Sequence, residues 1–175
     1  MIEKRGVKLI LLVIPIVVLV LLIPQHFSMP VEHARRNDYN QESFWYAPWG
    51  KSGTHKGVDI FAKKGTNLNS PVSGLVVYTG EISMGGKAIV ILGPKWRLHY
   101  LAHLDRINAS LGWTNRNAKI GTVGDSGNAK GKPVHLHYSI VTLIPYFWKI
   151  DDSMQGWKKM FYLNPIPYLN EAKLR

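Results

Sequence analysis

Cysteine is absent from the 175 residues of this chain, and the absence limits both its fold and its chemistry. No disulfide framework is possible, so stability must come from an apolar core and from any bound metal. No thiolate is available as a nucleophile or as a metal ligand. A transition-metal site in this chain must therefore use nitrogen and oxygen ligands, which suit zinc.

Long runs of one charge are also absent, although the chain is basic, with 22 Lys and Arg against 11 Asp and Glu and a net charge of +11. The longest basic runs are pairs, such as Arg35-Arg36, Lys63-Lys64 and Lys158-Lys159. Nucleic-acid-binding proteins usually gather their positive charge in a stripe or along one helix. We therefore expect no nucleic-acid partner and interpret most of these charges as a solvated surface.

One long apolar run is present near the N-terminus. The 16 uncharged residues of Leu9–Pro24 follow Lys4, Arg5 and Lys8. This run is slightly shorter than the ~20 residues that cross a bilayer core, but residues 25–27 can lie in the interface. Because positive flanks stay in the cytoplasm, the sequence predicts a single membrane-spanning helix with the rest of the chain on the outer side.

A cleaved signal peptide is the alternative to this anchor. The apolar run is long for a signal peptide, and HFSMP offers no small-x-small cleavage site, so we favour an uncleaved anchor over residues 1–27. The absence of a nearby cysteine excludes lipoprotein processing. Polar residues 28–47 are predicted to form a tether. Cleavage near residue 27 would instead give a secreted protein.

The remainder reads as a β-rich domain. Residues 50–140 show no sustained helical periodicity and no internal repeat, and glycines interrupt short apolar or alternating runs. Gly85-Gly86 is a plausible hairpin turn. We predict a mainly antiparallel β domain over residues 48–169, followed by a tail at 170–175. The predicted strands are 57–61, 72–79, 87–92, 97–104, 120–123 and 134–141.

The segment 141–163 has a different composition. Phe147, Trp148, Trp157 and Phe161 alternate with lysines, and residues 151–153 could cap a short helix. We expect these aromatic side chains mainly to complete the core, with a groove wall or a membrane-surface contact as alternatives. The closing LNPIPYL, with two prolines, is predicted to be extended.

Histidines supply the most informative pattern. His55 stands four residues before Asp59 in THKGVDIF, His103 follows in YLAHL, and His135 and His137 form H-L-H in KPVHLHYSI. On a strand, residues two apart share one face, with Cα atoms ~6.6 Å apart. The H-x-H pair would therefore face a cleft while its neighbours face the core. A lone histidine is usually structural, but the combination with H-x-x-x-D favours a metal site.

Such a site predicts a particular chemistry. Three protein ligands and one open position are typical of catalytic zinc, which lowers the pKa of bound water towards ~7 and gives a hydroxide nucleophile. Attack on an amide carbonyl creates an oxyanion, and a further histidine can carry the proton to the leaving amine. Spacing alone leaves open whether His135 or His137 is a ligand, and whether His103 is one. Alternation places His103 on the face that also carries His99 and Leu101.

The segment Gly124-Asp125-Ser126-Gly127 imitates the nucleophile motif of chymotrypsin-like serine proteases. Only 22 residues separate His103 from Ser126, too few for two barrels to fold between them. We interpret GDSGNAKG as a loop of turn-forming residues.

With these residues in view, the chain resembles the M23 family of zinc endopeptidases, which includes lysostaphin and LytM-like enzymes. The resemblance covers about residues 48 to 169. It rests on five segments in the family's order, namely HKGVDIFAKKGTNLNSPVSGLVVYTG, GGKAIVIL, HYLAHLD, KIGTVGDSGNAKGKPVHLHYSI and NPIPYL.

The resemblance implies a compact antiparallel LytM-like sheet that holds one zinc ion per chain. By position, it makes His55, Asp59 and His137 the zinc ligands, His135 the general base or acid, and His103 the residue that stabilises the oxyanion. All five positions are intact, which favours catalysis over the alternative of a non-catalytic regulator of a cell-wall amidase. A secreted bacteriolytic peptidase is the other alternative, and it would require cleavage near residue 27.

The implied reaction is hydrolysis of peptide cross-links in bacterial peptidoglycan. D-Ala to diaminopimelate links and glycine bridges are both candidate substrates. Combined with the predicted anchor, the resemblance places the catalytic domain on the outer side of the bacterial inner membrane.

Overall fold

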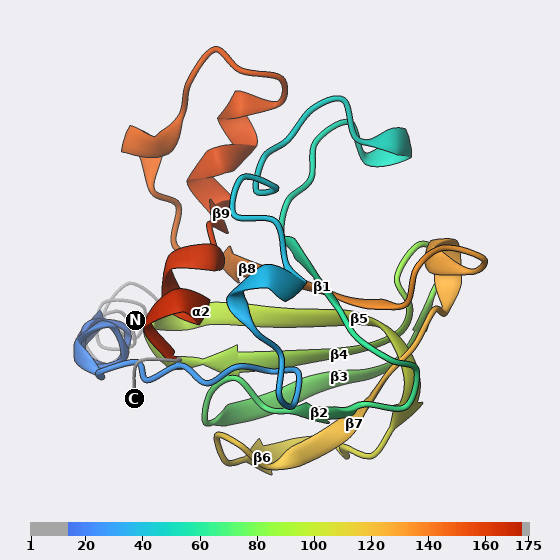
Figure 1. Cartoon of the computed structure of the whole chain (residues 1–175). Coiled ribbons are helices and arrows are strands. Elements are labelled where there is room, and N and C mark those ends of the chain that lie inside the picture. Colours follow the sequence, from blue (N-terminus) through green and yellow to red (C-terminus); the bar gives the residue numbers. More distant parts are fainter. Residues whose placement is uncertain (1–13, 173–175) are drawn as a thin grey trace.

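One antiparallel β-sheet forms the body of the protein, and the computed structural model describes residues 14–172. The main path of the sheet runs β1-β8-β5-β4-β3-β6, while β7 pairs with β2 and β5, and β9 pairs with β8 (Figure 1). Every pair is antiparallel, which confirms the predicted mainly β class. The strands are β1 (Val58–Phe61), β2 (Asn67–Asn69), β3 (Gly74–Ile82), β4 (Gly86–Gly93), β5 (Arg97–Ile107), β6 (Gly112–Thr114), β7 (Lys119–Val123), β8 (His135–Thr142) and β9 (Tyr162–Leu163).

Each of the six predicted strands is present within a few residues of its predicted ends. The strands that the sequence did not reveal are β2, β6 and β9, which have two or three residues each. A strand that short cannot display a period of two, so only its hydrogen-bonded partner identifies it.

The core lies against one face of the central strands. Leu136, Tyr138 and Ile140 of β8 are fully buried, as are Val58 and Ile60 of β1. This is the alternation predicted for the H-x-H strand. His135 and His137 alternate with the buried residues of β8 and therefore point to the opposite face.

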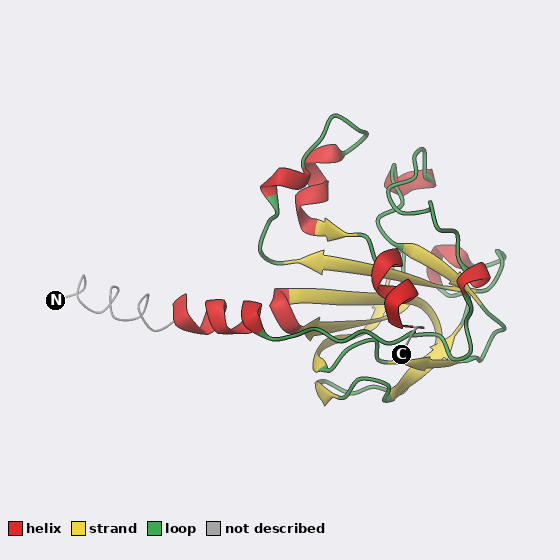
Figure 2. Cartoon of the chain, turned by 60° about the vertical axis from the view of Figure 1, so that its left-hand side comes forward, coloured by secondary structure: helices red, strands yellow, loops and turns green. Residues whose placement is uncertain are grey.

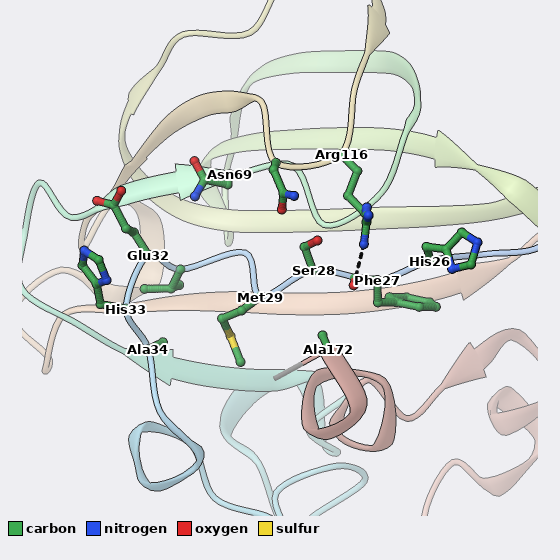
Figure 3. Close-up of a pocket in the computed structure, with 12 residues that line it drawn as sticks. His26, Phe27, Ser28, Met29, Glu32, His33, Ala34, Asn69, Arg116 and Ala172 are labelled. Carbon is green, nitrogen blue, oxygen red and sulfur yellow. Dashed lines mark hydrogen bonds between the residues drawn. The ribbon is translucent and has the colours of Figure 1, made fainter. Parts of the chain in front are cut away.

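The segment 28–47, which was predicted from the sequence to be a tether, lies along the domain. Val31 and Tyr39 are buried, and Val31 forms a β-bridge with Leu68. Figure 3 shows the first part of this segment between Arg116 and the C-terminal helix, where Arg116 Nη1 donates to the Phe27 carbonyl at 3.3 Å. We call residues 25–45 the strap.

The C-terminus corrects one prediction. LNPIPYL is not extended, because Ile166–Ala172 forms the helix α2. The Asn164 side chain accepts a hydrogen bond from the Ile166 amide, and prolines fit the start of a helix, where backbone N–H groups lack helical partners. Ile166 and Leu169 are buried against the core. Of the predicted tail, residues 170–172 complete α2, and residues 173–175 lie outside the described part.

Within residues 14–172, six short 3-10 helices connect these elements: η1 (Arg36–Asp38), η2 (Gly50–Ser52), η3 (Pro94–Trp96), η4 (Gly127–Ala129), η5 (Phe147–Lys149) and η6 (Gly156–Phe161). The last two lie in the aromatic segment after β8. Phe147, Trp148 and Trp157 are 64%, 78% and 56% exposed, so the expectation that they complete the core is wrong. Once β8 ends at Thr142, the chain turns away from the sheet, and 3-10 turns do not return these side chains to it.

The predicted anchor over residues 1–27 falls partly on residues 1–13, which lie outside the described residues. Residues 14–22 are helical and project from the domain (Figure 2). Within the described part, no helix is both long and apolar enough to cross a bilayer. The membrane anchor therefore stays a prediction.

Candidate metal centre

The pairing of β1 with β8 brings the candidate ligands together. Asp59 lies directly opposite His137 in this register, and His55 stands just before β1. One oxygen of Asp59, Oδ1, lies 3.1 Å from His55 Nε2 and 2.8 Å from His137 Nδ1. The His55 and His137 nitrogens are 3.2 Å apart. Among the described residues, these three form the one cluster of His, Asp or Glu able to hold a metal ion.

Hydrogen bonds on the outer side of each ring fix which nitrogen faces the cluster. His55 Nδ1 lies 3.0 Å from the Ser43 carbonyl oxygen, which can only accept, so Nδ1 carries the proton. His137 Nε2 lies 2.9 Å from Ser139 Oγ. The Ser139 hydroxyl donates to the Lys56 carbonyl at 2.7 Å, so it accepts from His137 Nε2–H. Each ring therefore turns an unprotonated nitrogen inward.

Three acceptor atoms with no proton between them consequently meet at one point. Lone pairs on two imidazoles and a carboxylate repel one another unless a cation lies among them. Two neutral histidines and one carboxylate are a ligand set of catalytic zinc sites, with a fourth position left for water or substrate. The donor chemistry of this cluster therefore fits zinc.

Electrostatics keep these groups in the form that binds metal. Burial alone would raise the pKa of Asp59, but its close contacts with the imidazoles of His137 and His55 outweigh burial and hold that pKa well below its usual value. Burial lowers the pKa of His137, although Asp59 opposes this effect. At neutral pH the pair is an ionised carboxylate beside a neutral imidazole.

His103 reaches the same cluster through an irregularity in β5. Ile89 pairs with Leu101, but Lys87 pairs with Leu104, so β5 carries one extra residue at this point. His103 takes a left-handed conformation with φ of 67°, as expected in a β-bulge. Strict alternation would have placed it with His99 and Leu101 on the core face, and that expectation is wrong.

His135 and His103 form the other side of the site. Their ring centroids are 5.0 Å apart, and His135 Nε2 lies 3.8 Å from Asp59 Oδ2. His103 Nδ1 is bound to the Ser126 carbonyl, and His135 Nδ1 to the Pro133 carbonyl. In both rings Nδ1 is thus occupied by a backbone carbonyl, and Nε2 remains for contacts within the groove. Burial lowers the pKa of His103 to about 4, despite the opposing hydrogen bond to Ser126, so its imidazole is neutral at pH 7.

The five residues line a groove of about 750 Å³. Two aromatic side chains that the sequence did not single out also line it. Trp49 stacks on His55 with ring centroids 4.2 Å apart, and Tyr100 meets His137 edge-on at 6.2 Å. Burial, with a smaller effect of Tyr78, raises the pKa of Tyr100 to about 12, so its hydroxyl stays protonated.

Two further residues that position the ligands were also missed. Ser139 could have been found from the sequence, because it lies two residues after His137 on the same face of the strand. Ser43 could not, since a backbone carbonyl that contacts His55 from the strap leaves no pattern in the sequence.

A second hollow, of about 670 Å³, lies between the strap, Asn69, Arg116 and the end of α2 (Figure 3). Its acidic residue, Glu32, accepts a hydrogen bond from Asn67. Unlike the groove, this hollow gathers no set of converging imidazoles and carboxylates from the described residues.

The fold and this residue cluster together define an antiparallel β domain with a candidate metal site in an open groove. A family model described as Peptidase family M23 matches residues 53–145, more than half of the chain. The chain belongs to this family, as the sequence motifs predicted.

Three similar proteins illustrate this relationship. DD-carboxypeptidase/endopeptidase Mpg of Neisseria meningitidis is 30% identical over 84 residues, which are 48% of this chain and 19% of that protein. A structure from Ruminococcus gnavus, assigned as the glycyl-glycine endopeptidase lytM, has a TM-score of 0.64 and 25% identity, over 86% of this chain and 61% of that one. The catalytic domain of lysostaphin, an antimicrobial peptidase of Staphylococcus simulans, has a TM-score of 0.59 and 24% identity, over 77% of this chain and 95% of that one.

Proposed function

We propose that this protein is a zinc-dependent endopeptidase that hydrolyses peptide cross-links of bacterial peptidoglycan. One observation carries the proposal. Inward-facing acceptor atoms of His55, Asp59 and His137 converge in a groove that His103 and His135 also line, each with Nδ1 bonded to a backbone carbonyl. That arrangement provides a metal, an open coordination position and two groups able to move protons.

The family and two similar proteins support the proposed substrate class. Lysostaphin is an antimicrobial peptidase, and the Neisseria protein is a DD-carboxypeptidase/endopeptidase. This chain matches only 19% of the Neisseria protein, so that protein's activity is extended to it here as a proposal. D-Ala to diaminopimelate links and glycine bridges remain the two candidate bonds.

The roles proposed for the residues follow from their positions. A zinc ion held by His55, Asp59 and His137 would act as a Lewis acid and lower the pKa of water towards ~7. His135 Nε2, 3.8 Å from Asp59 Oδ2, is placed to accept a proton from that water and return it to the leaving amine. His103 lies beside His135 and would stabilise the oxyanion as an N–H donor from Nε2 after its imidazole has taken up a proton from solvent.

The place of action is part of the proposal. An anchor over residues 1–27 would hold the domain on the outer side of the bacterial inner membrane, where its substrate lies. The apolar run Leu9–Pro24 behind a basic flank supports this location.

The test uses the purified full-length chain in detergent. We expect one zinc per chain and the release of peptides from isolated sacculi, with loss of both in Asp59→Ala. Lys119→Gln, on β7 and outside the groove, is the matched control and should behave as wild type. Release of peptides that persists after complete removal of metal would refute the mechanism. Stoichiometric zinc without any hydrolysis would favour the regulatory alternative.

A further inference from the structure

Large apolar side chains stand exposed where the aromatic segment leaves β8. Leu143, Phe147 and Trp148 are 52%, 64% and 78% exposed, although a soluble surface seldom gathers side chains of this size. Trp148 stacks on Tyr146, with ring centroids 5.1 Å apart, and this contact holds the exposed indole in place.

Leu143, the first of these residues, is linked to the N-terminal helix through Trp96. Trp96 Nε1 donates to the Val17 carbonyl of that helix at 3.1 Å. The Trp96 carbonyl accepts from the Leu143 amide at 2.9 Å. Lys95 and Trp96 both adopt left-handed conformations, with φ of 62° and 57°, and side chains other than glycine hold such conformations only where their surroundings enforce them.

Positive charge accompanies the apolar side chains. Lys95 lies in η3 and Lys149 ends η5. Within the described residues, the salt bridges of Lys and Arg involve Lys64, Arg106 and Lys159, so neither Lys95 nor Lys149 is paired with a carboxylate. We call Lys95, Trp96, Leu143, Phe147, Trp148 and Lys149 the collar.

We infer that the collar rests on the anionic lipid surface of the membrane that receives the N-terminal helix, an inference that depends on the anchor in the proposed function. Tryptophan prefers the interface between lipid and water, and lysine is attracted to anionic headgroups. The helix itself continues the apolar surface, with Leu19 61% and Leu22 71% exposed. Figure 2 shows η5 on the side of the domain from which this helix projects.

This contact would fix the orientation of the groove. The strap is joined to the sheet, because Gln25 Oε1 accepts from Arg97 Nη1 at 2.6 Å, so the helix is not followed by a free linker. Thr142, beside the collar, lies five positions after His137 along β8. At about 3.3 Å per residue, the metal centre would lie about 17 Å further from the lipid than the collar does.

The absence of cysteine allows a direct test with single-cysteine variants of the full-length chain in vesicles of phosphatidylglycerol and phosphatidylcholine. A fluorophore is attached to Phe147→Cys in the collar, to Leu19→Cys in the helix, or to Ser83→Cys. Ser83 is the control, because it lies in the β3–β4 turn, at the opposite end of these strands from η3. Lipids brominated near the headgroup then quench the probes that they can reach.

We expect quenching at residues 147 and 19 and none at 83. Replacing Trp148 and Lys149 by Gln in the Phe147→Cys chain should reduce the quenching at 147, whereas Trp113→Gln, which alters an equally exposed tryptophan, should not. Quenching at 19 but not at 147 would overturn the collar and leave the anchor intact. Absence of quenching at 19 would refute the anchor, and the collar contact with it.

Discussion

The two faces of β5 and β8 use the same residue types for different purposes. On the core face, His99 has both ring nitrogens bonded, Nδ1 to the Tyr138 hydroxyl at 2.7 Å and Nε2 to the Gln25 amide at 2.9 Å. On the groove face, His103 and His135 each have Nδ1 bonded to a backbone carbonyl and present Nε2 to the groove.

The difference shows what makes a histidine reactive in this protein. Burial lowers the pKa of His99 to about 3, with a smaller effect of Arg97, and that of His103 to about 4. Both rings are thus neutral at pH 7. A ring nitrogen that faces the groove distinguishes the groove histidines. We therefore expect substitutions on the groove face to affect zinc binding and catalysis, and substitutions on the core face to affect stability.

Substitution of a proposed zinc ligand should have the largest effect on zinc binding and hydrolysis. Asp59→Asn keeps the shape of the side chain but removes its charge, so we expect loss of bound zinc and of detectable hydrolysis. Metal content by mass spectrometry and peptide release from sacculi measure the two effects. An Asp59→Asn chain that kept full zinc and activity would exclude this carboxylate as a ligand.

The next largest loss of activity should come from His135→Asn. If His135 moves the proton, kcat should fall by about 10²–10⁴-fold while zinc content stays at one per chain. Steady-state kinetics and metal analysis on the same sample separate the two properties. Loss of zinc together with activity would instead make His135 a ligand.

A smaller effect is expected for Ser139→Ala. The hydroxyl orients His137 from outside the metal centre, and loss of such a partner typically weakens metal binding by about 10–100-fold. Competition with a zinc chelator measures this change. Ser139→Thr keeps the hydroxyl and should retain most of the affinity, whereas equal affinities for the Ala and wild-type chains would remove Ser139 from the site.

The smallest effect on catalysis should come from the core face. His99→Phe leaves the buried Tyr138 hydroxyl without its partner, so we expect a loss of about 1–3 kcal/mol of unfolding free energy with zinc affinity unchanged. Urea unfolding measures the first property and chelator competition the second. A large loss of zinc in this variant would contradict the separate roles that we assign to the two faces.

The pH dependence of stability sharpens the same distinction. The pKa of His99 in the folded chain, about 3, lies below its ordinary value of 6.5. Between these values the unfolded chain binds more protons, so stability should fall as the pH decreases from 6.5 towards 3. His99→Phe should show a shallower decrease in urea unfolding between pH 7 and pH 5, and an unchanged slope would contradict the assigned cause.

Much of this arrangement was readable from the sequence. The alternation around His135 and His137 predicted β8 and its two faces, because a period of two needs only local order. Segments without such a period were misjudged. The prolines of LNPIPYL suggested extended chain, but at the start of a helix they displace no hydrogen bond, and burial of Ile166 and Leu169 stabilises α2.

The sequence by itself determined which types of side chain could bind a metal and which segments carry them, since the absence of thiols and the spacing of His55, Asp59 and the H-x-H pair are local properties. Tertiary structure decided the rest. The bulge that turns His103 into the groove comes from the register with β4, and the carbonyl that orients His55 comes from the distant strap. Contacts between segments far apart in the chain leave no periodic trace, so only the folded protein could reveal them.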